Sequence, residues 1–419
     1  MTAIADASKG GFRLGMLIYD TRYRSMTIQI VALIGFLIAV GWIITNTAQN
    51  LADLGKQPSF GFLWEPSGYD INQHIIDYNS QSPHIRAAVI GLMNTLLVAV
   101  MGCVTATIIG VTVGVLRLSN NWMVSRLMAV YVETFRNIPV LLWIVLFNAV
   151  IIESLPQPKD FRGANATASM LLNDSVAITG RGLYVPEPLF AKGLGDLPLF
   201  GNAFSISLDL MAFLAVLGAG LLISALIKKR ADRVQEATGL RPRTWHYRLA
   251  VVVLPAVLVL WSLGFYLGYP ALKGFNFQGG TFMRGSLVAL WLALSLYTAT
   301  FIAEIVRAGI LAISKGQTEA AAALGLRPRR IMSLVILPQA LRVIIPPLIS
   351  QYLNLTKNSS LAIAVGYMDL TGTLMGITLN QTGRELESVL LGMLIYLAIS
   401  LSISGVMNWY NNSVKLKER

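Results

Sequence analysis

The residues that begin at Ser314 have the types and spacing of a compact helical segment that could meet another protein. Ser314 and Gln317 stand three residues apart, as in a helix-capping box, and predict the start of a helix. Glu319 would then lie in or near the first turn, where a carboxylate suits the helix dipole. Gly325 can adopt the left-handed conformation that ends a helix, and Pro328 suits the first turn of another. The sequence therefore predicts a short helix, a glycine turn and a second helix.

An alanine run would give the first of these helices a small face. Residues 320–323 are all alanine, a strong helix former that lets another protein approach closely. Three arginines follow the glycine turn, where a protein partner or lipid headgroups could meet them: Arg327, Arg329 and Arg330. An amphipathic connector without a partner fits the same pattern, and the pattern alone does not separate the two interpretations.

A second set of polar residues follows a proline pair inside an apolar stretch. Pro346-Pro347 frees backbone groups, which at membrane depth need protein or water around them. Segment 346–360 is therefore our candidate for the wall of a translocation path. The polar side chains that we select from it are Gln351, Asn354, Lys357 and Ser359. For Lys357 the alternative is an amine that snorkels to the outer membrane interface.

Two acid–base pairs lie within apolar stretches. Glu133 precedes Arg136 by three residues, and Glu304 precedes Arg307 by the same spacing, so each pair shares a helix face. Ionisable groups at membrane depth usually face protein or water, which permits a role in lining a path. The other interpretation, which we favour, is a pair of structural ion pairs near the cytoplasmic helix ends.

Catalytic and metal chemistry have little support. The chain lacks a Gly-x-x-x-x-Gly-Lys-Ser/Thr loop to bind phosphates, and the predicted membrane spans contain no histidine for an intramembrane enzyme. His74 and His84 share a polar segment with Asp70 and Asp77, where we favour a solvated loop over a metal site. We therefore expect no catalytic residue, no metal and no cofactor in this chain.

The composition indicates which elements must position these residues. Of the 419 residues, 55% are hydrophobic and only 13% are charged, whereas about a quarter are charged in a soluble domain. Apolar stretches that could each cross a bilayer predict an all-α integral membrane protein with eight spans. They are 28–45, 87–116, 127–152, 206–227, 249–269, 283–313, 340–357 and 387–410.

The net charge of +12 follows from basic residues gathered in certain loops, which argues against nucleic-acid binding. Segments 228–248 and 314–339 are rich in Lys and Arg, as cytoplasmic loops are. Segments 46–85 and 153–205 are poor or balanced in these residues and suit the outside. Both chain termini are basic, so we expect both in the cytoplasm.

The spacing of the docking segment, 314–338, resembles the cytoplasmic loop of ABC importer permeases. That pattern is Glu-Ala-Ala, three residues, Gly, nine residues, Ile, any residue and Leu-Pro, and here Val335 replaces the isoleucine. The matching residues are Glu319, Ala320, Ala321, Gly325, Leu337 and Pro338. The resemblance implies that Glu319, Ala320, Ala321 and Gly325 couple the chain to a separate cytoplasmic ABC ATPase dimer, which binds ATP and Mg. A secondary transporter or channel that works without an ATPase is the alternative.

Further segments resemble the permeases for histidine, glutamine, glutamate and arginine. They are 94–99, 117–119, 131–139, 297–310 and 357–361. The enlarged form is similar to the larger permeases of general L-amino-acid importers. This resemblance implies a type I importer permease core of five helices with about three additional spans, in a bacterial inner membrane. It also implies a second, homologous permease in a heterodimer and a periplasmic or extracellular amino-acid-binding protein, besides contact with membrane lipid.

The resemblance also implies a division of the chain. Residues 1–85 would hold the cytoplasmic N-terminus, the extra first span and an external loop. Residues 86–154 and 282–419 would form the permease core, and 155–281 would be an insert with two more spans.

Overall fold

The computed structural model divides the chain into two compact units, Met1–Phe60 and Gly61–Arg419. The residues that it describes are 16–53, 55, 58–163, 166–199 and 204–414. The first unit holds α1 (Met16–Tyr19) and α2 (Thr21–Asp53). Its long helix has a mean hydropathy of 2.4 and can cross a bilayer, and the predicted first span lies within it.

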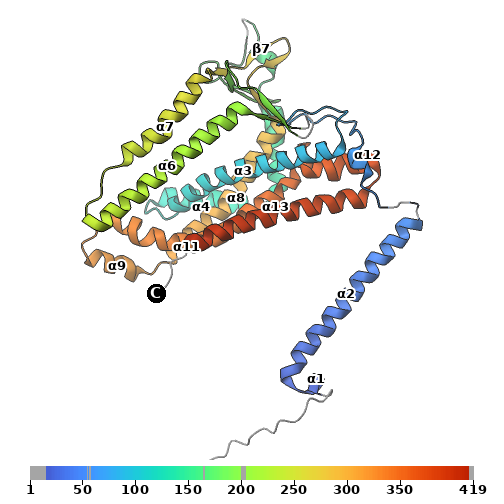
Figure 1. Cartoon of the computed structure of the whole chain (residues 1–419), viewed down its shortest axis with the longest axis horizontal. Helices are drawn as coiled ribbons and strands as arrows, with labels where there is room; N and C mark the ends of the chain where they lie inside the picture. The colour runs from blue at the N-terminus through green and yellow to red at the C-terminus, as the bar shows by residue number, and fades with distance from the viewer. Residues whose placement is uncertain (1–15, 54, 56–57, 164–165, 200–203, 415–419) are drawn as a thin grey trace, which may run out of the picture. The chain divides into compact units, whose positions relative to one another are not determined.

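The second unit holds the other helices, and Figure 1 shows their arrangement. The α-helices are α3 (His84–Leu116), α4 (Trp122–Asn137), α5 (Val140–Ser154), α6 (Leu208–Thr238), α7 (Trp245–Ser262), α8 (Gly285–Leu311), α9 (Lys315–Ala323), α10 (Pro328–Ile331), α11 (Leu337–Asn358), α12 (Leu379–Thr382) and α13 (Glu385–Val414). Shorter 3₁₀ or π segments are η1 (Gly61–Trp64), η2 (Pro158–Phe161), η3 (Met332–Ile336), η4 (Ser359–Val365) and η5 (Thr371–Thr378).

The third predicted span is bent rather than straight. Seven helical runs among the described residues can cross a membrane, and α4 with α5 makes an eighth if this pair counts as one span. The two helices meet at 104°, so the predicted span 127–152 is a bent pair of helices. The cause is Pro139, because a residue before proline avoids the helical conformation, and Ile138 is extended at φ −106° and ψ 133°.

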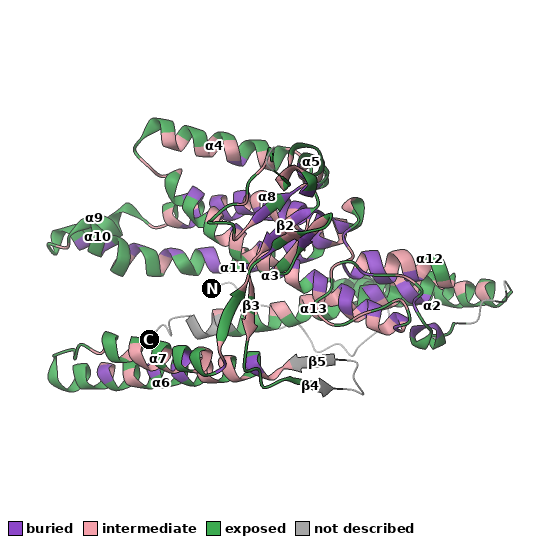
Figure 2. Cartoon of the chain, turned by 90° about the horizontal axis from the view of Figure 1, so that it is seen from above, coloured by how far each residue is buried: buried purple, intermediate pink, exposed green. Residues whose placement is uncertain are grey.

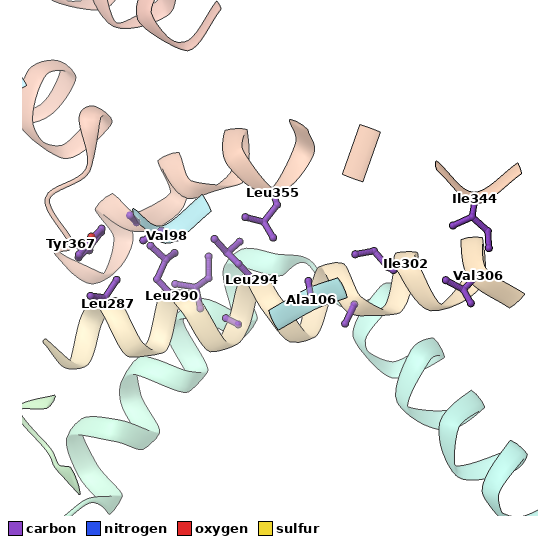
Figure 3. Packing of buried hydrophobic residues seen from close by; sticks show 14 of the residues in the cluster. Val98, Ala106, Leu287, Leu290, Leu294, Ile302, Val306, Ile344, Leu355 and Tyr367 are labelled. Carbon is purple, nitrogen blue, oxygen red and sulfur yellow. The ribbon is translucent and has the colours of Figure 1, made fainter. Parts of the chain in front are cut away.

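The central element of the second unit is α8, which lies among α3, α5 and α11. Figure 3 shows Leu287, Leu290 and Leu294 along this helix, close to Leu355 of α11 and to Tyr367. These five side chains are almost completely buried. Between membrane helices, such side chains stabilise the fold through close van der Waals packing, because lipid tails are as apolar as the side chains themselves.

The approach of α3 to α8 depends on glycine. A Cβ atom at Gly110 would lie 2.6 Å from Cβ of Ile302 and 2.8 Å from the carbonyl oxygen of Ala299. Small residues are typical where membrane helices pack closely, since their backbones can then touch. Gly110 therefore sets the distance between the two helices that form the centre of the core.

Short strands, which the all-α expectation did not include, occupy the segment between α5 and α8. They are β1 (Ala177–Thr179), β2 (Gly182–Val185), β3 (Glu187–Phe190), β4 (Asp196–Leu199), β5 (Phe204–Ser207), β6 (Phe265–Gly268), β7 (Ala271–Lys273), β8 (Asn276–Gln278) and β9 (Thr281–Arg284). Antiparallel pairing joins them in the orders β1-β2-β9, β3-β6, β4-β5 and β7-β8. Because β2 pairs with β9, the two ends of the segment lie side by side and leave α5 and α8 in contact.

The two extra spans of this segment form a separate hairpin. α6 and α7 pack against each other, and a Cβ at Gly220 would lie 2.9 Å from the carbonyl oxygen of Val251. Figure 2 shows these two helices largely exposed, whereas buried residues concentrate on α3 and α8. α7 ends at Ser262, earlier than predicted, because Gly264 turns the chain at φ +65° into β6.

The segment between the last two predicted spans is folded into the core. η4, η5 and α12 follow α11 there, and Tyr367, Leu370 and Leu374 are fully buried. This segment packs on α3 and α13, so it extends the wall of the core rather than forming an exposed connection.

Candidate coupling and translocation sites

The docking segment folds as a helix that begins where the sequence predicted. Ser314 is the N-cap of α9, with an extended backbone at φ −62° and ψ 142°. Its carbonyl oxygen accepts a hydrogen bond from the N–H of Gln317 at 3.1 Å. The Ser314 hydroxyl makes no capping hydrogen bond in the described structure, so the helix start is confirmed and the capping box is not.

Gly325 ends this helix in a Schellman motif. Its φ is +75°, its N–H donates to the oxygen of Ala322 at 2.9 Å, and the N–H of Leu326 donates to the oxygen of Ala321 at 3.3 Å. An added Cβ would meet no atom within 4 Å. Glycine is therefore required for its backbone conformation and not for space.

The four residues selected for coupling lie on two sides of α9. Glu319, Ala320 and Gly325 are exposed, whereas Ala321 is buried against Ile331. The small side chain of Ala321 allows α9 to lie directly on the next helix. The exposed three are available to a partner protein.

The second predicted helix is the beginning of a membrane helix. Pro328 is the first residue of α10, and the helical run continues from there through η3 and α11 as far as Val365. Gln339 also links α9 to this run, because its amide donates to Gln317 at 3.5 Å and to the oxygen of Val335 at 2.9 Å. A displacement of α9 would therefore act directly on a helix that crosses the membrane.

The candidate path residues do not all lie together. Asn354 and Lys357 are exposed on α11, and Gln351 is half-buried one turn earlier. Ser359 instead points into the core, where it is completely buried and donates to the oxygen of Thr356 at 2.7 Å. The first three therefore form a polar stripe along one side of α11.

Only one of the two predicted ion pairs forms among the described residues. Glu304 accepts a hydrogen bond from Arg307 at 3.1 Å and another from Arg117 at the end of α3. Arg136 instead lies over the ring of Phe301, 5.0 Å from its centre. These contacts join α3, α4 and α8, which favours the structural interpretation of the charges.

A buried polar cluster that the sequence did not reveal surrounds Asp369. This carboxylate is fully buried and accepts hydrogen bonds from the N–H of Gly372 at 2.8 Å and from the hydroxyl of Tyr396 at 3.0 Å. The amide of Asn94 on α3 donates to the oxygen of Met368 at 2.8 Å. The available signal was a lone aspartate in the apolar run 361–376.

The two histidines of the first polar segment lie in different surroundings. His84 is buried and its Nδ1 lies 2.9 Å from the hydroxyl of Thr378, whereas His74 is exposed. The described part of the chain contains no group of three His, Cys, Asp or Glu side chains that could hold a metal. The structure thus gives the metal alternative no support.

One protein-family model matches residues 106–416 of the chain. That family is described as the binding-protein-dependent transport system inner membrane component. The chain belongs to this family. It is therefore a permease subunit of ABC importers, and the alternative of a secondary transporter or channel is wrong.

Relatives of known name show the substrate class of the permease. It is 58% identical to the glutamate/glutamine/aspartate/asparagine transport system permease of Rhodobacter capsulatus, and the match covers 100% of both chains. It is 43% identical to the general L-amino acid transport system permease of Rhizobium johnstonii, over 98% of this chain and 96% of the relative. The permease is a subunit of an amino-acid ABC transporter.

A shorter relative shows how much has been added. The probable glutamine ABC transporter permease of Bacillus subtilis is 33% identical over 214 residues. The match covers 94% of that protein but only 50% of this chain. About half of this permease thus corresponds to nearly the whole of the shorter relative, and the other half lies outside that match.

Proposed function

We propose that this permease couples to a cytoplasmic ABC ATPase dimer through Glu319, Ala320, Ala321 and Gly325. The ATPase binds ATP and Mg and hydrolyses the nucleotide, and the permease contributes no catalytic group. The observation that carries this proposal is the exposed α9, fixed by its Schellman turn to a helical run that continues through the membrane. A rigid element can transmit a displacement that a flexible loop would absorb.

A charge reversal at Glu319 tests the proposed contact. Glu319→Lys should weaken ATPase binding because it places a positive charge on the exposed face of α9, beside Ala320. Glu236→Lys is the matched control, since Glu236 is an exposed acid in the other basic segment. The measurement is co-purification of the ATPase with each variant, together with amino-acid uptake. Normal ATPase binding by Glu319→Lys would refute the contact.

A second permease should cover the polar stripe of α11. Asn354 and Lys357 are exposed in this chain. Polar and charged side chains within a membrane span usually face protein or water rather than lipid. We infer that a homologous permease, in a heterodimer, packs on this side and encloses the path lined by Gln351, Asn354 and Lys357. Ser359 would support the wall from within the core.

For this function, we expect the permease to lie in a bacterial inner membrane with both chain termini in the cytoplasm. The turn between α6 and α7 lies at the same end of the second unit as α9, and the strands lie at the opposite end (Figure 1). This arrangement supports a basic cytoplasmic end and an external end that meets an amino-acid-binding protein. Acidic and amide amino acids, named for the Rhodobacter relative, are the proposed cargo.

Cysteine labelling tests the orientation. Leu172 and Leu240 are each 77% exposed and lie in segments assigned to opposite faces. In a Cys103→Ser background, an impermeant maleimide applied outside intact cells should label Leu172→Cys and spare Leu240→Cys. Labelling of both, or of Leu240→Cys alone, would contradict the proposed topology.

A further inference from the structure

A polar cavity of 440 Å³ lies where the β1-β2-β9 sheet meets the end of α5 and the start of α8. The polar side chains on its wall include Asn72, Asn148, Arg181, Asn276, Arg284 and Ser286. Neither arginine has an acidic partner among the described residues, and no aspartate or glutamate lines the cavity. The wall therefore carries an excess of positive charge and of hydrogen-bond donors.

The pairing of β2 with β9 brings the two arginines together. Gly182 pairs with Arg284 across the strands, so Arg181 and Arg284 come close in space although they are distant in sequence, and both line the cavity. The N–H of Gly285 donates to the oxygen of Arg181 at 2.9 Å, and the N–H of Arg284 donates to Oε1 of Gln73 at 3.0 Å. The backbone beneath both guanidinium groups is thus fixed.

Ser286 adds an unused donor at the same place. It lines the cavity in the first turn of α8, is only 7% exposed, and its hydroxyl has no hydrogen-bond partner among the described residues. Arg284, the N-cap residue, gives α8 no side-chain cap. The first turn of a long helix carries partial positive charge, so the serine hydroxyl and the helix end both favour an anion.

Tyr184, which also lines the cavity, fixes a further donor group, the side-chain amide of Asn276. The hydroxyl of Tyr184 donates to Oδ1 of Asn276 at 2.9 Å, which orients the amide of Asn276. Burial raises the pKa of Tyr184, while its bond to Asn276 and the charge of Arg181 oppose the shift. The phenol therefore remains protonated and keeps its role as a donor to Asn276.

We propose that this cavity binds a carboxylate group. Guanidinium groups bind carboxylates through strong charge-assisted hydrogen bonds, and the serine and asparagine donors suit the remaining oxygen lone pairs. The carboxylate belongs to an amino acid that enters the permease or to an acidic side chain of the binding protein. This assignment rests on the proposed function, in which the strands face the outside of the cell. The inserted segment supplies Arg181 and Asn276 to the site.

Direct binding to the full-length permease complex in lipid nanodiscs tests the site. The probes are L-glutamate, glutarate and glutaramide, and the last replaces both carboxylates of glutarate by neutral amides. We expect saturable binding of L-glutamate, competition by glutarate and no competition by glutaramide. Nanodiscs expose both membrane faces and binding needs no ATP hydrolysis, so this result is independent of both topology and coupling.

Variants connect the binding to the cavity. Arg284→Gln and Arg181→Gln should each weaken L-glutamate binding about tenfold, which is the size of one lost charge-assisted hydrogen bond. Ser286→Ala should have a smaller effect, and Arg284→Lys should retain part of the affinity because it keeps the charge. Arg162→Gln is the matched control, since Arg162 lies over the ring of Phe275 and does not line the cavity.

A second measurement separates the two sources of the carboxylate. Binding of the substrate-free binding protein to the same nanodiscs should weaken in Arg284→Gln and Arg181→Gln if its acidic side chain is the ligand. Weaker L-glutamate binding identifies the free amino acid instead. Should both arginine variants match Arg162→Gln in both measurements, the proposal is wrong, whatever the outcome of the coupling and labelling experiments.

Discussion

The core helix α8 is less apolar than the hairpin helix α6, yet it is far more deeply buried. The most apolar window of α8 has a mean hydropathy of 1.8 and is 67% buried, whereas that of α6 has 2.6 and is 11% buried. Hydrophobicity alone therefore does not indicate which membrane helix forms the core. The difference lies in the number of helices around each one, because α8 lies among α3, α5 and α11, whereas α6 packs mainly on α7.

The largest expected effect distinguishes two glycines in these regions. Gly110→Val should strongly destabilise the permease, because its side chain would overlap Ile302 and the backbone of Ala299. Overpacking of this kind costs about 1–3 kcal/mol and sometimes more. The matched control is Gly218→Val on α6, where an added Cβ meets no atom within 4 Å. Folded yield and thermal unfolding in detergent measure both variants, and equal stability would contradict the packing difference.

A modification experiment sharpens the comparison at the level of transport. In a Cys103→Ser background, a bulky membrane-permeant maleimide on Asn354→Cys should block most amino-acid uptake, because this position lies on the proposed path. The same reagent on Leu222→Cys should leave uptake unchanged, since Leu222 is 70% exposed on α6, which we expect to lie outside the path. Loss of uptake in the Leu222 variant would place the hairpin on the substrate route. Unchanged uptake in the modified Asn354 variant would remove this side of α11 from the path.

The smallest expected effect concerns the contact within the hairpin. Arg248 Nε donates to the hydroxyl of Ser224 at 3.3 Å, and Ser224→Ala removes this bond. The loss should lower stability by no more than about 0.5–1.5 kcal/mol and leave uptake intact. Thermal unfolding measures the stability of this variant, and an uptake assay measures its transport of amino acids. A large loss of uptake would show that the hairpin contributes more than a peripheral anchor.

The sequence predicted the backbone of segment 314–338 well because its signals are local. Ser314, Gly325 and Pro328 each determine the backbone within a few residues of themselves, and the structure places all three as expected. The bend between α4 and α5 was missed, although Pro139 is a local signal, because the apolar residues on both sides of it together have the length of one membrane span. The strands were missed since three or four residues are too few to show a reliable alternation.

The cavity beside the β1-β2-β9 sheet could not be predicted because it depends on contacts between distant residues. Arg181 and Arg284 become neighbours only through the register of β2 with β9. Asp369 shows the same limitation, since it lies between η4 and η5 and its partner Tyr396 lies on α13. The sequence also could not show that Ser359 would be buried while Asn354 and Lys357 are exposed. Helical spacing alone does not reveal which side of α11 the core covers.

The central claim is that the α9 turn couples the ATPase to the membrane helices, and Gly325→Val tests it most directly. A β-branched residue at φ +75° is strained, so the turn should shift α9 relative to α10. Gly316→Val is the control, because Gly316 lies within α9 without a positive φ, and an added Cβ there meets no atom within 4 Å. Both variants should reach the membrane, as neither changes a span.

The decisive measurement is amino-acid uptake by reconstituted vesicles, recorded together with ATP hydrolysis. The account predicts that Gly325→Val loses uptake, either with weakened ATPase binding or with hydrolysis no longer linked to transport, while Gly316→Val retains most of it. Full uptake and normal ATPase binding in Gly325→Val would contradict the account.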